Sequence, residues 1–412
     1  MTIGRRQIIA GLAGAASLPL ALAATPATAQ SGKKRESRRR KDAKSPEHHV
    51  DVAVIGAGAI GAWTAWHLVR RGQSVRLFDA YGAGNGRAAS NLPTMLLDPA
   101  QGGDALYAAM APDSLAAWKD LSASASLPII TPTPVVTALT PSDASYLAGD
   151  PRLQGGATLR SRFGQMGWQD AEQGLIGADG AMLPGRRPIL ETIADARLSC
   201  EDVVMPAPLE DKKAGRYNLP NGGTASHLVY ACGAWLTEIF PQLLTPAKLS
   251  AVRHQIYHFG PGQGDVQFRP PAMPALIDRA AGFSALPDLE GRGVRVWSHH
   301  ADASVDPDSF DRRSDDRALA AARQWLSARL PRLENGPILS SAATHDCRTA
   351  SGDLLLDRFP GHARVWLVGG AAGRGFGLAP AIGERVADHI NHAGKMVEAR
   401  WSLPRLLERS AS

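Results

Sequence analysis

Cysteine is scarce in this 412-residue chain, which holds three, at Cys200, Cys232 and Cys347. Their odd number, their wide spacing and the lack of a C-x-x-C pair exclude a disulfide framework and a cysteine-based zinc site. The histidine pairs at 48–49 and 299–300 have no third ligand near them in the sequence. We therefore predict no metal site.

The main part of the chain also lacks an excess of positive charge, although the whole chain has a net charge of +6. Residues 1–44 carry ten basic and two acidic groups, so the remaining chain has a net charge of about −2. This balance does not favour binding of nucleic acid by the folded part. Residues 30–47 are strongly basic and almost free of apolar side chains, and we predict that they form a disordered linker.

A long unbroken apolar run is missing as well. The stretch from Ile8 to Ala24 is interrupted by two glycines and Pro19, which argues against a permanent membrane anchor. Arg5-Arg6 before it and the A-x-A pattern after it are typical of a twin-arginine signal peptide over residues 1–29. We predict a periplasmic or exported protein that uses the twin-arginine export machinery, with a retained N-terminal anchor as the alternative.

What the chain does have is a glycine fingerprint in the sequence V-A-V-I-G-A-G-A-I-G, residues 52–61. Gly56 permits a tight turn after a buried strand, and Gly58 lets the backbone approach a pyrophosphate. Gly61 lets the following helix pack closely against the strand. The pattern predicts a dinucleotide site, and a glycine-rich turn kept only for packing is the alternative.

The residues after the fingerprint complete this pattern. Ala59 and Ile60 begin a helix whose free N–H groups and positive dipole end attract phosphates, and Gly72 can end it. A second short apolar run closes on Asp79, 23 residues after the first glycine, where a carboxylate can accept bonds from ribose hydroxyls. Arg87, in the loop that follows, contacts either the cofactor's phosphate and adenine side or only solvent.

Two later segments repeat the strand-and-glycine theme. Residues 227–235 form an apolar run that ends in Gly-Ala-Trp, and residues 365–368 form another that opens into a third glycine-rich turn. A helix-like stretch over 380–390 follows that turn. Because the third turn lies more than 300 residues after the first, we expect the chain to return and cover the other end of the cofactor. The candidate cofactor residues in these two segments are Gly233, Trp235, Gly373, Gly375, Phe376 and Gly377.

In this order and spacing the motifs resemble the D-amino-acid oxidase superfamily of FAD enzymes, closest to the monomeric sarcosine oxidase and N-methyltryptophan oxidase group. The resemblance runs from about His48 to Ile390 and is carried by residues 58–68, 233–235, 252–255, 293–299 and the closing glycine-rich turn. It implies FAD as the cofactor and an α/β (overall α+β) fold. That fold has a discontinuous Rossmann-like FAD-binding domain and a second, mixed-sheet substrate domain.

The resemblance also implies domain boundaries. We place the FAD-binding domain at residues 48–110, 180–245 and 338–400. The substrate domain then comprises residues 111–179 and 246–337.

Departures from the family pattern fall on the substrate side. Where the group has a lysine that looks like its oxygen-activating residue, this chain has Arg295. Strand alternation puts Arg295, Trp297 and His299 on one face. A guanidinium can stabilise negative charge, but its pKa is too high for lysine-like proton donation. Arg295 and His299 are candidate catalytic residues, and a solvent-facing strand edge is the alternative for both.

The carboxylate clamp that the resemblance implies is also altered. Met95 and Asp98 stand where the group has arginines, and Gly377 stands where it has a lysine. Asp98 would repel a substrate carboxylate and attract a cation, which makes it a third candidate catalytic residue. We expect an amine substrate without a free α-carboxylate at that place.

Cys347 lies near the position where sarcosine oxidases attach FAD through a thioether. The local register does not match the family spacing, so non-covalent FAD is the leading expectation and a covalent link through Cys347 the alternative.

Together these observations predict an exported FAD-dependent oxidoreductase that oxidises the C–N bond of a small amine by hydride transfer to flavin. Its electron acceptor is either oxygen or, in a flavin dehydrogenase, a quinone or carrier protein. The sequence is also compatible with an FAD-binding assembly partner without catalysis and with an NAD-dependent Rossmann dehydrogenase.

Overall fold

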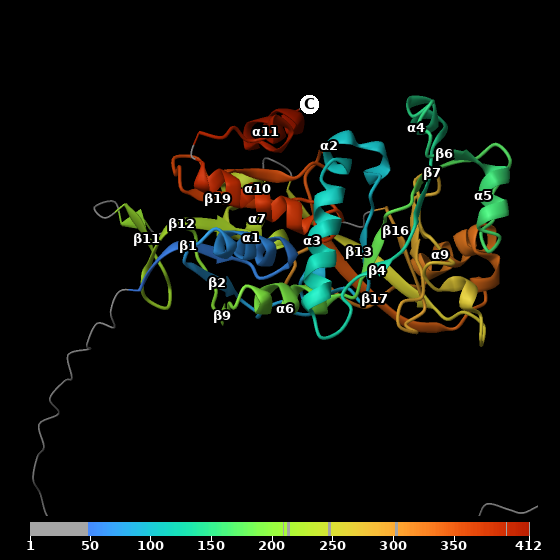
Figure 1. Ribbon diagram of the computed structural model, residues 1–412, viewed down its shortest axis with the longest axis horizontal. Coiled ribbons are helices and arrows are strands. Elements are labelled where there is room, and N and C mark those ends of the chain that lie inside the picture. The colour runs from blue at the N-terminus through green and yellow to red at the C-terminus, as the bar shows by residue number, and fades with distance from the viewer. Residues whose placement is uncertain are drawn as a thin grey trace, which may run out of the picture. The chain divides into compact units, whose positions relative to one another are not determined.

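The computed structural model describes residues 48–208, 210–211, 215–245, 249–300, 304–392 and 394–411. The predicted signal peptide and linker (residues 1–29 and 30–47) lie outside these residues. The described chain forms two eight-stranded sheets and one three-stranded sheet, with helices packed on both large sheets (Figure 1). This arrangement confirms the predicted fold class.

The first sheet has the order β10-β11-β12-β1-β2-β9, with β19 on β12 and β18 on β19. Strands β9, β2, β1, β12 and β19 run parallel. The run Val52–Ile55 is buried, as expected of a central parallel strand covered on both faces. The strands are β1 (His49–Ile55), β2 (Val75–Asp79), β9 (Cys200–Asp202), β10 (Glu210–Asp211), β11 (Arg216–Asn218), β12 (Thr224–Tyr230), β18 (Leu355–Arg358) and β19 (Val365–Gly369).

Four helices pack together on one face of this sheet, α1 (Ala59–Arg70), α3 (Ala111–Ser124), α6 (Arg186–Asp195) and α10 (Ala379–Asn391) (Figure 1). Helices α1 and α10 cross so closely that a Cβ at Gly383 would lie 2.6 Å from the backbone nitrogen of Thr64. The opposite face is covered by α7 (Leu236–Ile239), α8 (Pro241–Leu244) and α11 (Leu403–Ala411).

The second sheet has the order β17-β13-β16-β15-β14-β5-β7-β6. Val294 and Val296 of β16 pack into a core with helix α9 (Asp316–Arg329). Because side chains alternate along a strand, Arg295 between them points to the other face, away from α9. The strands are β5 (Val135–Ala138), β6 (Leu153–Gly155), β7 (Gln173–Gly177), β13 (Ser250–Phe259), β14 (Ala275–Asp278), β15 (Phe283–Leu286), β16 (Val294–Ser298) and β17 (Ile338–Arg348).

A small sheet and three short helices lie among the connections between these layers. The sheet has the order β3-β8-β4. Its strands are β3 (Met95–Leu97), β4 (Thr131–Pro132) and β8 (Ala181–Leu183), and the helices are α2 (Ala105–Ala108), α4 (Pro141–Tyr146) and α5 (Gly156–Arg162).

The sheets divide the chain differently from the predicted boundaries at two elements. Helix α3 was assigned to the substrate domain, but its Trp118 is buried in the core under α1 and stacks on Phe376 with ring centroids 5.8 Å apart. Strand β17 was assigned to the FAD-binding domain, but it pairs along its length with β13 of the second sheet. Both boundaries depend on long-range packing, which local periodicity does not encode.

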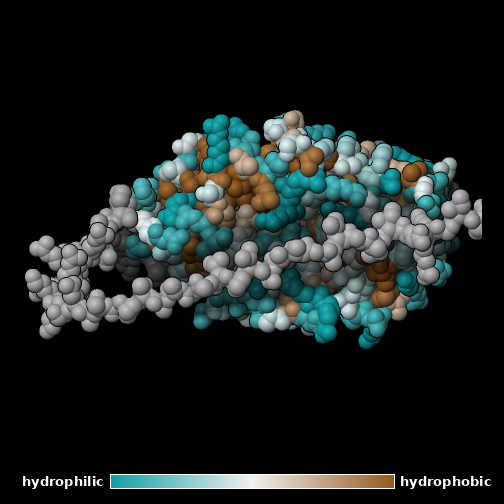
Figure 2. All heavy atoms as spheres, turned by 90° about the horizontal axis from the view of Figure 1, so that it is seen from below, coloured by the Kyte–Doolittle hydropathy of each residue, from teal (hydrophilic) through white to brown (hydrophobic). Residues whose placement is uncertain are grey.

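On the face drawn in Figure 2, hydrophilic side chains cover most of the visible described surface, with apolar patches between them. No helix within the described residues is both long and apolar enough to cross a membrane.

A buried ion pair holds α9 against the second sheet. Arg329 Nε donates to Asp278 Oδ2 at 2.9 Å, and Trp325 Nε1 donates to the same oxygen at 3.0 Å. The other end of the guanidinium donates to Glu172 Oε1 at 2.6 Å. The Asp278 side chain is fully buried, so removing its partner would leave a charge without compensation.

We predict that Arg329→Met lowers the free energy of unfolding by about 3 kcal/mol, because Asp278 loses the guanidinium that neutralises it. Denaturant unfolding measures the change. The matched control is Arg405→Met in the exposed pair with Glu408, which should change stability by less than about 1 kcal/mol. Equal effects of the two substitutions would contradict this account of Arg329.

Candidate active site

A cavity of about 1460 Å³ lies where the parallel strands of the first sheet end. Ile55 of β1, Asp79 of β2 and Gly369 of β19 line one side, at the carboxyl ends of their strands. Ile256 of β13 and Arg295 of β16 line the other side. Ligands of open α/β sheets bind at this edge, and the volume exceeds that of an ordinary small-molecule pocket. The cavity is large enough for a dinucleotide and a substrate together.

The glycine fingerprint forms the floor of the cavity. Gly56 has a φ of +101°, and a Cβ there would lie 2.5 Å from the carbonyl oxygen of Ala231. A Cβ at Gly61 would lie 1.8 Å from the carbonyl oxygen of Gly56. Gly58 is different, because its Cβ would meet only Ser90 Oγ, at 3.2 Å, on the cavity side. Gly56 and Gly61 are required for folding, whereas Gly58 leaves the backbone open to a ligand.

The first turn of α1 offers an anion site at this floor. Gly58 is the N-cap residue and no side chain caps the helix, so the first N–H groups are left for a ligand. Asp79 lies beside the turn, where it accepts bonds from the backbone N–H groups of Ala57 and Tyr81, each at 2.9 Å. Burial raises the pKa of Asp79, while those two N–H groups oppose the shift. The free N–H groups of α1 can bind a pyrophosphate, and the carboxylate of Asp79 beside them can accept bonds from the hydroxyls of the ribose.

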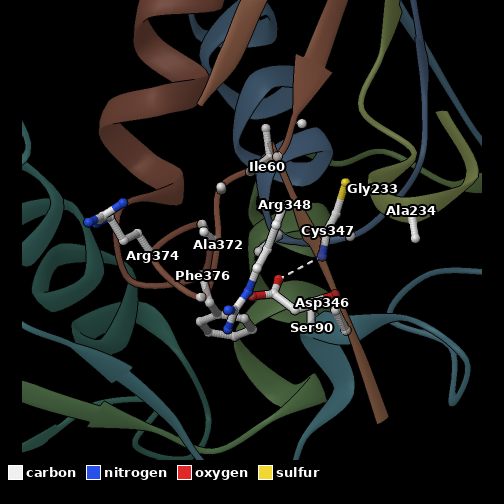
Figure 3. Close-up of a pocket in the computed structure, with 18 of the residues that line it drawn as sticks. Ile60, Ser90, Gly233, Ala234, Asp346, Cys347, Arg348, Ala372, Arg374 and Phe376 are labelled. Carbon is white, nitrogen blue, oxygen red and sulfur yellow. Dashed lines mark hydrogen bonds and ion pairs between the residues drawn. The ribbon is translucent and has the colours of Figure 1, made fainter. Parts of the chain in front are cut away.

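The returning glycine-rich turn lies next to this floor, although it is far away in sequence. A Cβ at Gly375 would lie 3.3 Å from the Ile60 side chain, and Figure 3 shows Ile60, Ala372 and Phe376 around the same space. Gly233 lines the cavity after β12, and so does Trp235, whose Nε1 is buried with no partner among the described residues. The distant segments therefore enclose one elongated site.

Thirteen of the sixteen predicted site residues line this cavity. The other three, Gly61, Gly377 and Arg87, do not. Gly61 and Gly377 stand behind the wall, where a Cβ at Gly377 would lie 2.6 Å from the carbonyl oxygen of Leu96. The thirteen are Gly56, Gly58, Ala59, Ile60, Asp79, Asp98, Gly233, Trp235, Arg295, His299, Gly373, Gly375 and Phe376.

Arg87 lies outside the lining of the cavity, and it binds other protein groups instead of facing only solvent. Its guanidinium is half exposed and binds Asp308 at 3.0 Å, while its Cζ lies 4.4 Å from the centre of the Tyr81 ring. Its carbonyl oxygen accepts a bond from His345. The arginine therefore ties the cofactor-side loop to the segment around Asp308.

Arg295 does not lie on a solvent-facing strand edge, so that alternative is wrong for it. Strand β16 sits between β13 and β15, and Arg295 is 6% exposed. Its Nη1 donates to the carbonyl oxygen of Thr94, and the guanidinium lies 4.6 Å from the centre of the Trp297 ring. Burial lowers the pKa of Arg295 to about 10, so the group stays cationic at neutral pH.

His299 lines the same wall as Arg295. Its Nε2 lies 2.6 Å from Ser284 Oγ. His254, on the neighbouring strand β13, is buried and also lines the cavity. Burial, followed by the nearby charge of Arg348, lowers the pKa of both histidines to about 4. Two neutral imidazoles therefore face the cavity at neutral pH.

Asp98 lies in the wall, but its carboxylate is already held. Oδ1 accepts the backbone N–H of Ala100 at 2.9 Å, and Gln101 Nε2 donates to the Asp98 carbonyl oxygen at 2.6 Å. Burial raises the pKa of Asp98, although the N–H groups of this loop and the charge of Arg374 oppose it. The residue shapes the loop and presents little of its charge to a substrate.

Cys347 is buried beside the cavity, and Figure 3 shows its sulfur near Gly233. Burial raises the pKa of the thiol to about 12. Because a thiol with this pKa stays protonated at neutral pH, the site favours non-covalent FAD.

Several lining residues were not predicted from the sequence. Ser284, His254 and Arg348 come from strands whose period-2 alternation could have marked them as facing the same way as Arg295. Arg400 comes from the C-terminal segment, beyond the resemblance, and no sequence pattern pointed to it. Asn85 lines the cavity and donates to Asp79 Oδ1 at 3.1 Å.

The fold and the cavity are those of an α/β protein of the dinucleotide-binding type, whose second sheet forms the opposite wall of the cavity. The family model for FAD-dependent oxidoreductases of the DAO type matches residues 51–389. The chain belongs to this family, and it is an FAD-dependent oxidoreductase. This result excludes the NAD-dependent alternative and confirms the predicted cofactor.

Individual relatives agree with this family. The N-methyl-L-tryptophan oxidase of Salmonella arizonae is 24% identical over 82% of this chain and 94% of its own length. The monomeric sarcosine oxidase of Streptomyces avermitilis is 25% identical over 82% of this chain and 92% of its own. Among solved structures, Amadoriase I of Aspergillus fumigatus superposes with a TM-score of 0.71 at 20% identity, over 88% of this chain and 91% of that one.

We predict that Gly58→Ala weakens FAD binding by about 10-fold or more, equivalent to about 1.4 kcal/mol, because its methyl group obstructs the pyrophosphate approach while the fold tolerates it. Equilibrium dialysis of FAD with the refolded apoprotein measures the dissociation constant. Gly262→Ala, in open space outside the cavity, is the control and should leave binding unchanged. Unchanged FAD binding by Gly58→Ala would contradict the assignment of this turn as the phosphate-binding site.

Proposed function

We propose that this protein oxidises the C–N bond of a small amine by hydride transfer. The observation that carries the proposal is the continuous cavity, which extends from the phosphate-binding turn of α1 to Arg295 and His299 on the second sheet. FAD supplies the hydride acceptor when it is bound, and the protein supplies position and electrostatics. The names of the sarcosine and N-methyltryptophan oxidases support an amine as the substrate.

The neutral histidines suit this reaction. Hydride loss from the carbon beside nitrogen needs a free nitrogen lone pair, so a substrate ammonium must first lose its proton. His299 and His254, each with a pKa of about 4, face the cavity in the form that can accept a hydrogen bond from nitrogen. Arg295 remains cationic beside them and stabilises negative charge that develops on the reduced cofactor.

We propose further that the substrate places no α-carboxylate beside residues 95–98. Met95 carries no charge, and Asp98 is held by the backbone of its own loop. Neither residue supplies the cation that the family resemblance implies at these positions.

Two finer parts of the proposal concern transport and the electron acceptor. Arg5-Arg6 and the apolar stretch after them support export through the twin-arginine route, which carries folded proteins with their cofactors. Arg295 in place of a lysine supports slow reaction with oxygen, so a quinone or a carrier protein is the alternative acceptor.

The test of the proposed function is anaerobic. We expect that one or more secondary amines bleach the visible absorption of the bound flavin under nitrogen, and that the corresponding imine or its hydrolysis product forms in equal amount. Stopped-flow absorbance measures the rate. Failure of a broad amine panel to bleach the flavin would favour the non-catalytic alternative.

The role of Arg295 has its own prediction. Arg295→Lys should speed reoxidation of the reduced flavin by oxygen by about 10-fold or more, because it restores the lysine that the family resemblance implies at this position and puts a compact ammonium where the delocalised guanidinium lies. Reoxidation is followed after photoreduction and mixing with air-saturated buffer. Arg295→Met removes the charge and serves as the control, with a rate at or below that of the unaltered protein. A faster rate in Arg295→Met would contradict this role.

A further inference from the structure

Three tryptophans and a phenylalanine form a continuous line of rings from the cavity wall to the surface of α1. Phe376, which lines the cavity, stacks on Trp118 with ring centroids 5.8 Å apart and an angle of 8° between the planes. Trp118 meets Trp63 edge to face at 5.0 Å, and the centroids of Trp63 and Trp66 are 5.1 Å apart. Aromatic pairs in contact have centroid distances of about 4.5–7 Å, so each ring touches the next.

Distant segments of the chain hold these rings in order. Phe376 belongs to the closing glycine-rich turn, where Figure 3 shows it beside the cavity, and Trp118 comes from α3. Trp63 and Trp66 lie three residues apart on one side of α1. Trp118 and Trp63 are 0% and 1% exposed, whereas Trp66 is partly exposed. The line therefore has an interior shielded from solvent and one end that reaches it.

The outer end of this line has a proton acceptor. Trp66 Nε1 donates to Asp195 Oδ2 at 2.7 Å, and Arg70 Nη2 donates to the same oxygen at 2.8 Å. Burial would raise the pKa of Asp195, but these hydrogen bonds outweigh it and lower the pKa, so the carboxylate is ionised at neutral pH. The Arg70 guanidinium lies 4.9 Å from the centre of the Trp66 ring, where it opposes positive charge on the indole. An oxidised Trp66 is therefore favoured to lose its N–H proton to Asp195.

Other aromatic side chains of the cavity are placed differently. Trp297 lies 4.6 Å from the Arg295 guanidinium, whose positive charge disfavours the loss of an electron from the indole. Trp235 lies beside Tyr81 at a centroid distance of 6.0 Å, and the backbone N–H of Tyr81 donates to Asp79, at the ribose end of the site. The line through Trp118 starts instead at the closing turn, which we expect to cover the other end of the cofactor.

We propose that Trp118, Trp63 and Trp66 form an electron-transfer path through which a thiol at the surface reduces the bound flavin in blue light. Indole is among the side chains most readily oxidised by one electron, and electrons pass rapidly between rings in contact. Phe376 is not oxidised itself, and its ring fills the gap between the cavity and Trp118. This light-driven activity lies beyond amine oxidation and requires only bound FAD.

The electrons and protons of this reaction balance. FAD supplies a strongly oxidising excited state when it is bound and absorbs blue light. Trp118 gives up one electron, which Trp63 and then Trp66 replace. Trp66 releases its Nε1 proton to Asp195, which passes it to solvent, and a thiol returns one hydrogen atom to Trp66. Two such events put two electrons and, from solvent, their protons on the flavin and join two thiols as a disulfide.

The test follows this light reaction in the oxidised, FAD-loaded protein without oxygen and without an amine. Dithiothreitol is the thiol. Transient absorption detects the neutral tryptophan radical, and steady illumination measures the bleaching of the flavin absorbance. We expect the unaltered protein to form a long-lived radical and to bleach. Trp66→Phe should lose the long-lived radical and most of the bleaching, because the oxidised indole then stays inside the protein and takes its electron back from the flavin.

Further variants make the result specific. Trp118→Phe should also lengthen the lifetime of the flavin fluorescence, because Trp118 is the first donor. Asp195→Asn should shorten the lifetime of the radical, since asparagine cannot take the proton. The matched control is Trp168→Phe, because Trp168 is buried in the core of the second sheet, and it should leave the radical and the bleaching unchanged. FAD content and thermal unfolding of Trp66→Phe should match those of the unaltered protein, since the partly exposed position keeps an aromatic ring.

Two results would overturn the proposal. One is an undiminished radical and undiminished bleaching in Trp66→Phe, which would mean that the flavin is reduced within the cavity itself. The other is the loss of both signals in Tyr81→Phe, which would assign the path to Trp235 and Tyr81. Failure of every amine to bleach the flavin in the dark would contradict amine oxidation and leave this path standing.

Discussion

The structure depends on a steric constraint at the turn between β1 and α1. The carbonyl oxygen of Gly56 occupies the place of a Cβ on Gly61, and the backbone after β12 occupies that of a Cβ on Gly56. Strands β1 and β12 and helix α1 can therefore pack this closely only with glycine at these positions. The close packing puts the start of α1 at the carboxyl edge of the sheet, and β12 and β19 extend that edge to form a cavity for an elongated cofactor.

The second sheet completes the cavity with buried charge. Arg295 and Arg348 enter from β16 and β17. Burial and then the charge of Arg348 lower the pKa of His254 and His299, and the charge of Arg295 adds to the shift at His254, so both rings are neutral. The wall thus combines cations with neutral hydrogen-bonding groups in one small volume. Such a wall suits a reaction in which negative charge develops on the cofactor while a proton leaves the substrate.

Sequence reasoning found residues that line the cavity where one short motif carries its own geometry. The fingerprint glycines, Asp79 and the Gly233–Trp235 turn could be assigned because each needs a special backbone or a strand end. It was less successful where a side chain has two possible partners. Arg87 binds Asp308, more than 200 residues away, and Asp98 is held by its own loop, and neither partner can be read from local spacing. The placement of α3 and β17 depended on long-range packing in the same way.

By itself the sequence determined the cofactor class, because close backbone approach to a pyrophosphate admits few residue patterns and this chain has one of them. It also determined that Arg295, Trp297 and His299 share a face, since a strand alternates with a period of two. Only the tertiary structure decided which way that face points. It showed that β16 is an inner strand, that Arg295 is buried and that Trp118 stacks on Phe376, because these properties arise from contacts between segments far apart in the chain.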